Sequence, residues 1–232
     1  MEKNTIILSM ATQKGGSGKT LLTHLLSLAL AGKKEMKQVL VIDADAQGSL
    51  LVGRDYAKKN QDNADQQFPY TLEACTLDNL REKLKANYGK YDYIFIDIPG
   101  TLHMEGVRAA FLMCDFIFLP VLPSVIDFDA AMNTINVINQ IKEEKKKIGS
   151  DLKYYCILNQ AEPNRINTKM LLQAWESNKI PNVGKPVLRY EKYKNLQVET
   201  TNILDKNIES WGSEEQALHA FFEEFKNILN NN

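Results

Sequence analysis

Cysteine is scarce in this sequence. Only three cysteines occur among 232 residues, they lie far apart, and no two of them form a C-x-x-C pair. This spacing argues against a disulfide framework and against a zinc or iron–sulfur centre built on paired thiolates. We therefore expect three reduced thiols, mostly buried, at Cys75, Cys114 and Cys156.

Long apolar runs and an excess of charge are also missing. No apolar run approaches the ~20 residues that a membrane-spanning helix needs, and the N-terminus carries neither a long apolar segment nor a small-residue cleavage site.

The net charge is −1, so any nucleic-acid surface must be a local patch. Hydrophobic residues make up 44% and charged residues 25% of the chain, as in ordinary globular proteins. We expect a cytoplasmic protein with one domain over residues 1–232.

Apolar runs alternate with helical patterns along the chain. This order predicts the α/β class, with a mostly parallel twisted sheet and helices on both faces. Residues 54–70 are polar and lack clear periodicity, so we expect a surface excursion there. The expected strands are 5–10, 38–42, 93–96, 116–121, 154–158 and, as a last strand, 186–188. The expected helices are 21–31, 77–88, 105–113, 127–148, 167–178 and a C-terminal one whose apolar face holds Leu218, Phe221, Phe222, Phe225 and Leu229.

A glycine-rich loop, Gln13 to Thr20, joins the first apolar run to the first expected helix. The backbone N–H groups of such a loop and the N-terminus of the helix together form an anion site. Lys19 can reach the β- and γ-phosphates of a nucleotide, and the Thr20 hydroxyl can ligate Mg²⁺. The loop fits the P-loop pattern G-x-x-x-x-G-K-[ST] except at its first position, where Gln13 replaces glycine. The glycines that let the backbone approach a phosphate are Gly15, Gly16 and Gly18.

Three carboxylates follow expected strands. In an open α/β sheet, ligands bind in the crevice at the carboxyl ends of the strands. Asp97 follows a four-residue apolar run, which is the Walker B arrangement, where one carboxylate from a buried strand faces Mg²⁺, often through water. Asp43 and Asp45 follow the strand at 38–42. If that strand persists, their side chains lie on opposite pleat faces and need not share one task.

A second lysine, Lys14, stands near the start of the loop, in the order Gln-Lys-Gly-Gly. The loop resembles the deviant Walker A motif of the ParA/MinD family of ATPases, and its start looks like the ParA branch. The resemblance implies ATP and Mg²⁺ as ligands, an ATP-dependent homodimer, and a Lys14 that reaches the partner's nucleotide. Leu21 departs from the motif, since many members have threonine there, so a hydroxyl contact to the α-phosphate is expected to be missing. The implied nucleotide-binding residues are Lys14, Gly15, Gly16, Ser17, Gly18, Lys19, Thr20 and Leu21.

The acidic segments extend this resemblance, which runs from Ile6 to about Leu229. Residues 43–47 match the family's Asp-x-Asp-Pro-Gln switch I segment, with Ala46 in place of proline. The match implies that Asp45 positions or activates the attacking water. It also implies that Asp43 supports the metal shell, together with Thr20 and Asp97. The implied catalytic residues are Lys14, Lys19 and Asp45.

Three further places in the sequence carry implied roles. Pro99 and Gly100 stand where the family has the switch turn whose backbone N–H senses the γ-phosphate. Asn159 follows the strand at 154–158 and matches a position that hydrogen-bonds the base edge, although asparagine after a strand is also a common turn residue. Residues 120–124 resemble a family segment near the nucleotide.

Several functions remain open within this resemblance. The first is a short ParA-type partition ATPase, without an N-terminal helix-turn-helix. Its ATP-bound sandwich dimer would bind double-stranded DNA nonspecifically on the nucleoid, until a ParB-like partner triggers hydrolysis. The second is a MinD-type membrane ATPase, but segment 209–226 has five acids against one base, and anionic lipid repels such a helix. The others are a biosynthetic ligase, such as a dethiobiotin synthetase, and a noncatalytic nucleotide-gated module. Lys14 and the switch I match argue against the ligase, and the complete catalytic set argues against the module.

Two basic stretches could contact DNA. Residues 185–194 hold four bases and one acid with two interleaved tyrosines, and a solvated loop is an equal alternative. We expect Arg189, Lys192 and Lys194 to form the patch. The other stretch, Lys145 to Lys147, ends the expected helix 127–148, where a solvated face is the favoured interpretation.

Overall fold

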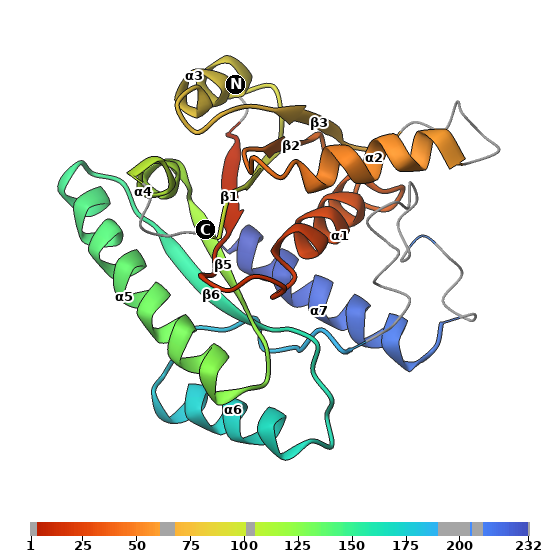
Figure 1. Ribbon diagram of the computed structural model, residues 1–232, viewed down its shortest axis with the longest axis vertical. Helices are drawn as coiled ribbons and strands as arrows, with labels where there is room; N and C mark the ends of the chain where they lie inside the picture. Colours follow the sequence, from red (N-terminus) through yellow and green to blue (C-terminus); the bar gives the residue numbers. More distant parts are fainter. Residues whose placement is uncertain (1–3, 61–67, 101–104, 190–204, 206–210, 232) are drawn as a thin grey trace.

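A computed structural model describes residues 4–60, 68–100, 105–189, 205 and 211–231. Within these residues six parallel strands form one sheet in the order β3-β2-β4-β1-β5-β6, and seven helices surround it (Figure 1). The strands are β1 (Ile6–Met10), β2 (Val39–Asp43), β3 (Thr71–Ala74), β4 (Tyr93–Asp97), β5 (Phe116–Val121) and β6 (Lys153–Leu158). The helices are α1 (Lys19–Ala31), α2 (Ser49–Asn60), α3 (Leu80–Asn87), α4 (Glu105–Met113), α5 (Val125–Lys147), α6 (Ile166–Ser177) and α7 (Ser213–Asn230).

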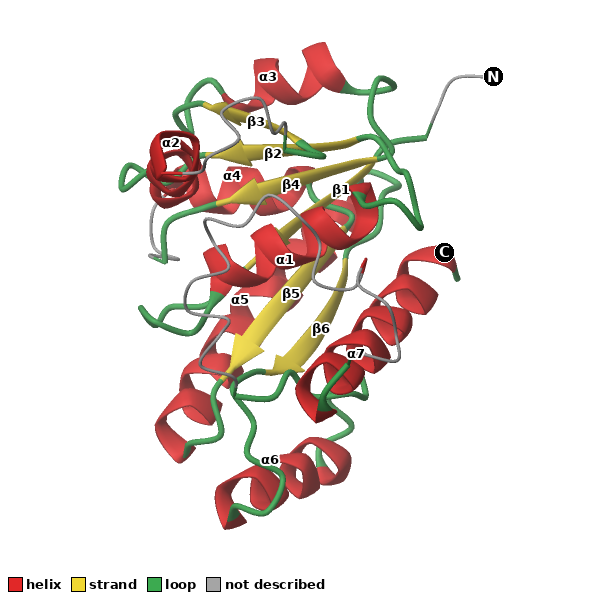
Figure 2. Cartoon of the chain, turned by 90° about the vertical axis from the view of Figure 1, so that its right-hand side faces the viewer, coloured by secondary structure: helices red, strands yellow, loops and turns green. Residues whose placement is uncertain are grey.

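The sheet separates two hydrophobic layers. Along β2, Val39 and Val41 point into the layer that α1 and α7 cover, whereas Leu40 and Ile42 point into the layer of α3, α4 and α5. Successive strand side chains alternate in this way because the pleat has a period of two. Figure 2 shows α1 and α7 in front of the strands and α4 and α5 behind them. The expected fold class, a parallel sheet with helices on both faces, is confirmed.

The region after β2 differs from the sequence-based expectation. Residues 54–60 belong to α2, not to a surface excursion, and β3 follows at residues 71–74. The sequence pattern did not reveal helix α2, because only two of its apolar side chains, Leu50 and Ala57, are buried. Strand β3 is a short edge strand with no fully buried residue, so it lacks an apolar run. Residues 61–67 lie outside the described part of the chain.

Other expectations also need correction. Residues 186–188 form no strand, and an isolated bridge joins Leu188 to Ala161. Lys145 is buried, not solvated, and its ammonium group donates a hydrogen bond to the carbonyl oxygen of Cys114. Lys146 pairs with Glu143 at 2.7 Å. The basic stretch at the end of α5 is therefore not a continuous positive surface.

The cysteines and the C-terminal helix behave as expected. All three cysteines are free, with two of them buried. The apolar face of α7, which includes Phe221 and Phe225, is buried against the layer of α1. Among the described helices, none is long and apolar enough to cross a bilayer.

Candidate nucleotide-binding site

The glycine loop lies between β1 and α1, at the carboxyl edge of the sheet (Figure 1). Gly16 and Gly18 have positive φ angles of 75° and 94°, a region that side chains with a Cβ rarely adopt. Gly18 precedes the first residue of α1, so the loop ends on a helix N-terminus with unpaired N–H groups. The backbone of the loop thus fits the anion site that the sequence predicts.

Lys19 stands at the start of α1, against the expected switch turn. A Cβ atom built on Gly100 would lie 3.2 Å from Lys19 Nζ and 3.4 Å from the carbonyl oxygen of Thr12. The backbone at Gly100 therefore lies close to the lysine ammonium. Burial lowers the pKa of the Lys19 ammonium, while Asp97 and Asp45 raise it. The P-loop lysine, the switch turn and two of the predicted acids therefore meet at one place.

Asp97 ends β4 in a fully buried position. Neither carboxylate oxygen makes a hydrogen bond of normal geometry with any residue that the structure describes. The pKa of this carboxyl is raised to about 7, chiefly by burial and also by Asp43 and Asp45, against the lowering effects of the Thr20 side chain and Lys19. A buried acid without partners costs free energy, and a bound cation would remove that cost.

Asp43 and Asp45 lie beside Asp97, because β2 and β4 are neighbours in the sheet. Asp43 pairs in register with Asp97, and the Ala44 N–H donates to the Asp97 carbonyl at 2.8 Å. Strand β2 ends at Asp43, so Asp45 is in a turn, where its carboxylate accepts a hydrogen bond from Gln47 N–H at 2.9 Å. The opposite-face geometry therefore does not apply, and both acids act on Asp97.

Asp43 also touches the helix that follows it. Burial raises the pKa of its carboxyl, and the backbone N–H groups of Asp45, Leu51 and Leu50 lower it. One of its oxygens, Oδ2, is buried without a partner in the described chain. Asp43 thus fixes the first turn of α2 relative to the sheet and keeps one oxygen free for a ligand.

These residues fit a Mg²⁺ ion that arrives with a nucleotide. Mg²⁺ prefers oxygen ligands and usually takes several from phosphates and water, with one or two from protein carboxylates. Asp97 and Asp43 offer unpartnered carboxylate oxygens, and Thr20 adds a hydroxyl beside them. Two carboxylates and one hydroxyl match the share of ligands that a protein supplies to Mg²⁺ when phosphates and water supply the rest.

Lys14 has a partner that sequence reasoning missed. Its ammonium group forms an ion pair with Asp127 Oδ2 at 2.8 Å, and its side chain is 42% exposed. Asp127 is buried in the first turn of α5, where the hydroxyl of the N-cap residue Ser124 also contacts its carboxylate. The Asp127 N–H donates back to Ser124 Oγ at 3.1 Å. The signal in the sequence was the capping pattern Ser-x-x-Asp, which marks this helix start.

Asn159 holds the loop from the other side. It is buried just after β6, and its Nδ2 donates to the Ser17 carbonyl at 2.7 Å. A Cβ on Gly18 would come within 2.4 Å of the same Nδ2 atom. The Asn159 amide thus braces the P-loop, and its contact with a base stays a prediction.

The expected DNA patch is only partly described. Arg189 is exposed, and its guanidinium lies 3.4 Å from Glu162 Oε1. Lys192 and Lys194 lie outside the described residues.

A parallel sheet with a glycine loop before α1, a lysine at the helix start and acids at neighbouring strand ends defines a P-loop nucleotide-binding protein. Residues 8–198 match the family described as the CobQ/CobB/MinD/ParA nucleotide binding domain. The chain belongs to this family, and the deviant Walker A resemblance of its loop is confirmed.

Three relatives illustrate the similarity. The "Maintenance of carboxysome distribution protein A" of Halothiobacillus neapolitanus is 33% identical over 196 residues, which cover 84% of this chain and 85% of that protein. The solved structure of apo McdA from Cyanothece has a TM-score of 0.72 at 17% identity, with 96% of this chain and 100% of that chain covered. The septum site-determining protein MinD of Pyrococcus horikoshii, solved with Mg-ADP, has a TM-score of 0.68 at 22% identity, with 97% of each chain covered. At these identities the two structures show the shared fold.

Proposed function

We propose that this protein is an ATP-dependent positioning ATPase of the ParA type. ATP closes a sandwich dimer, the dimer binds double-stranded DNA without sequence preference, and hydrolysis of ATP to ADP and phosphate releases it. An activating partner of the ParB kind stimulates hydrolysis. The observation that carries this proposal is Lys14, a second P-loop lysine that stays partly exposed and is held by Asp127.

The chemistry follows from the charges at the sheet edge. Lys19 binds the β- and γ-phosphates, because it follows the glycine loop at the N-terminus of α1, where backbone N–H groups also attract anions. Thr20, Asp43 and Asp97 hold Mg²⁺, which neutralises charge on the phosphates. Asp45 lies in the turn after β2, where it orients the attacking water. A Lys14 supplied from the partner chain stabilises the charge that develops in the transition state, as an arginine finger does.

Two features support a DNA-bound cytoplasmic state over a membrane-bound one. The phenylalanines of the acidic α7 are buried in the core, so this helix has no free apolar face for lipid. Arg189 is exposed within the basic stretch 185–194. Two such patches on one dimer would neutralise more phosphates than one chain can, which makes binding ATP-dependent and steeply dependent on salt.

The test is the retention of the full chain, with Mg²⁺, on duplex DNA of two unrelated sequences and on anionic liposomes, measured with and without nucleotide and together with the ATPase rate under the same conditions. We expect equal DNA retention on both duplexes only with a slowly hydrolysed ATP analogue, and no retention on liposomes. Lys19→Ala is the control, since it should lose ATP binding and with it DNA retention. Nucleotide-independent DNA binding, or liposome binding that needs ATP, would contradict the proposal.

A further inference from the structure

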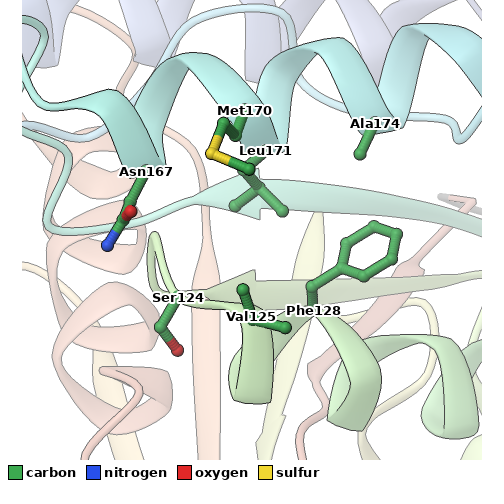
Figure 3. A pocket seen from close by; sticks show the side chains of 7 residues that line it. All are labelled: Ser124, Val125, Phe128, Asn167, Met170, Leu171 and Ala174. Carbon is green, nitrogen blue, oxygen red and sulfur yellow. The ribbon is translucent and has the colours of Figure 1, made fainter.

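An apolar groove lies between the first turn of α5 and the first two to three turns of α6, close to the Lys14 ion pair. Val125 and Phe128 of α5 face Met170, Leu171 and Ala174 of α6 across it (Figure 3). The groove has a volume of about 120 Å³, enough for one apolar side chain. Its lining also includes Ser124 and Asn167, and none of the seven lining residues carries a charge.

Two residues that line this groove, Val125 and Met170, are exposed, and so are Ile126 and Ile166, which neighbour the lining residues Val125 and Asn167 in the sequence. Val125 is 70% exposed, Ile126 71%, Ile166 71% and Met170 55%. We call these four residues the apolar corner. Single exposed apolar residues are ordinary, but a contiguous group that frames an apolar groove indicates a binding surface.

We propose that a second copy of this chain covers the apolar corner in the ATP-bound dimer. The inference rests on the proposed function, because it assumes that ATP brings two chains together at the nucleotide edge. All six strands are parallel, so the P-loop and the starts of α5 and α6 lie along the same carboxyl edge of the sheet. A two-fold dimer formed on that edge presents the same surface from each chain.

The apolar corner is continuous with the residue expected to cross the interface. Ser124 lines the groove and also contacts Asp127, which holds Lys14. A chain that receives Lys14 from its neighbour must therefore lie within reach of Val125 and Ile126. This continuity identifies the second copy as the occupant.

The shape of the surface supports the same occupant. A two-fold interface must fit itself, and here protruding isoleucine and methionine side chains stand next to an apolar groove that can receive one. The uncharged lining gives no attraction for phosphates, so DNA does not fit this place. Each apolar contact occurs twice in such a dimer, which doubles the effect of any substitution.

The chain offers a matched control for the test. Ile126 and Ile148 stand at opposite ends of α5 with similar exposure, 71% and 77%. We expect Ile126→Ser and Met170→Ser each to weaken the dimer formed with Mg²⁺ and a slowly hydrolysed ATP analogue by about 30-fold or more, measured by analytical ultracentrifugation. Ile148→Ser should leave the dimer dissociation constant within twofold of the wild type. Analogue affinity, measured at concentrations where every chain is monomeric, should stay unchanged in all three variants.

The outcomes separate this inference from the proposed function. If the wild type dimerises with the analogue and Ile126→Ser and Met170→Ser dimerise equally well, the apolar corner is not in the interface, while the proposed function stands. An equal loss in Ile148→Ser would also overturn the inference, because the effect would not be local. A wild type that stays monomeric with the analogue would overturn both.

Cross-linking provides a second measurement that does not depend on affinity. In a Cys75→Ser background, Met170→Cys should form a cross-linked dimer with a short bismaleimide only when the ATP analogue is bound. Ile148→Cys should not. Cross-links of Met170→Cys that form equally without nucleotide would contradict the assignment.

Discussion

We predict that the buried carboxylate of Asp97 lowers the free energy of unfolding of the nucleotide-free protein. Its carboxyl is buried at the end of β4 without a hydrogen bond of normal geometry in the described chain. The substitution Asp97→Asn keeps the shape and removes the charge. We therefore expect this variant to be more stable than the wild type at neutral pH and, at the same time, to lose Mg²⁺-dependent nucleotide binding.

The magnitude follows from the pKa. Burial raises the Asp97 pKa from 3.8 to about 7, so between these values the folded chain holds a proton that the unfolded chain has lost. The free energy of unfolding of the wild type therefore falls as pH rises from 3.8 to about 7, and this contribution is level above that. Each pH unit within this range lowers the free energy of unfolding by about 1.36 kcal/mol. The total loss is therefore about 4 kcal/mol at pH 8 and roughly 1.5 kcal/mol at pH 5. The asparagine amide carries its own burial cost of ~1–3 kcal/mol, but that cost does not vary with pH.

The assay is urea unfolding of the wild type and Asp97→Asn, with EDTA and without nucleotide, from pH 5 to pH 8. We expect the difference in unfolding free energy to change by about 2–3 kcal/mol in favour of the variant over this range. Asp129→Asn, at an exposed position of α5, serves as the control and should follow the wild type. Mg²⁺ with ATP should stabilise the wild type and Asp129→Asn but not Asp97→Asn.

Parallel pH dependences for the wild type and Asp97→Asn would refute this reasoning, because they would mean that Asp97 is solvated or paired in the folded chain. A variant that binds Mg²⁺ and ATP as tightly as the wild type would remove Asp97 from the metal site.

Three further predictions concern turnover and DNA. Asp45→Ala should retain ATP binding and slow hydrolysis by about 10²-fold or more, trapping the dimer; wild-type turnover would assign the water to another residue. Lys14→Ala should lose hydrolysis, because the partner chain then supplies no positive charge to the transferred phosphate; a normal rate in a single-turnover assay would show that Lys14 does not act across the interface. Changing Arg189, Lys192 and Lys194 together to alanine should reduce duplex affinity, flatten the slope of log K against log salt and leave ATP binding intact; equal DNA retention at two salt concentrations would exclude this patch.

Local pattern was enough for much of the site. The loop from Gln13 to Thr20 could be identified from the sequence, because its glycine spacing and its terminal Lys-Thr pair involve only residues close together in the chain. Asp97 was found in the same way, as an acid directly after an apolar run. The alternating apolar and helical segments also sufficed for the fold class, since burial on both faces of a parallel strand leaves continuous apolar runs.

The sequence was less informative where burial is partial or partners are distant. Helix α2 and strand β3 bury few side chains, so neither shows a clear period. Lys145 looked solvated within a run of lysines, and only the packing of α5 against the end of α4 shows that it is buried on the Cys114 carbonyl.

The sequence by itself determined the class of fold, the phosphate loop and the acids at the strand ends, because each depends on residues a few positions apart. Only the tertiary structure brought Lys14 to Asp127 and Ser17 to Asn159, pairs separated by 113 and 142 residues. Strand order decides which distant segments share the carboxyl edge of a sheet, and that order comes from long-range packing. The same packing placed the apolar start of α5 beside α6, close to the ion pair of Lys14 with Asp127.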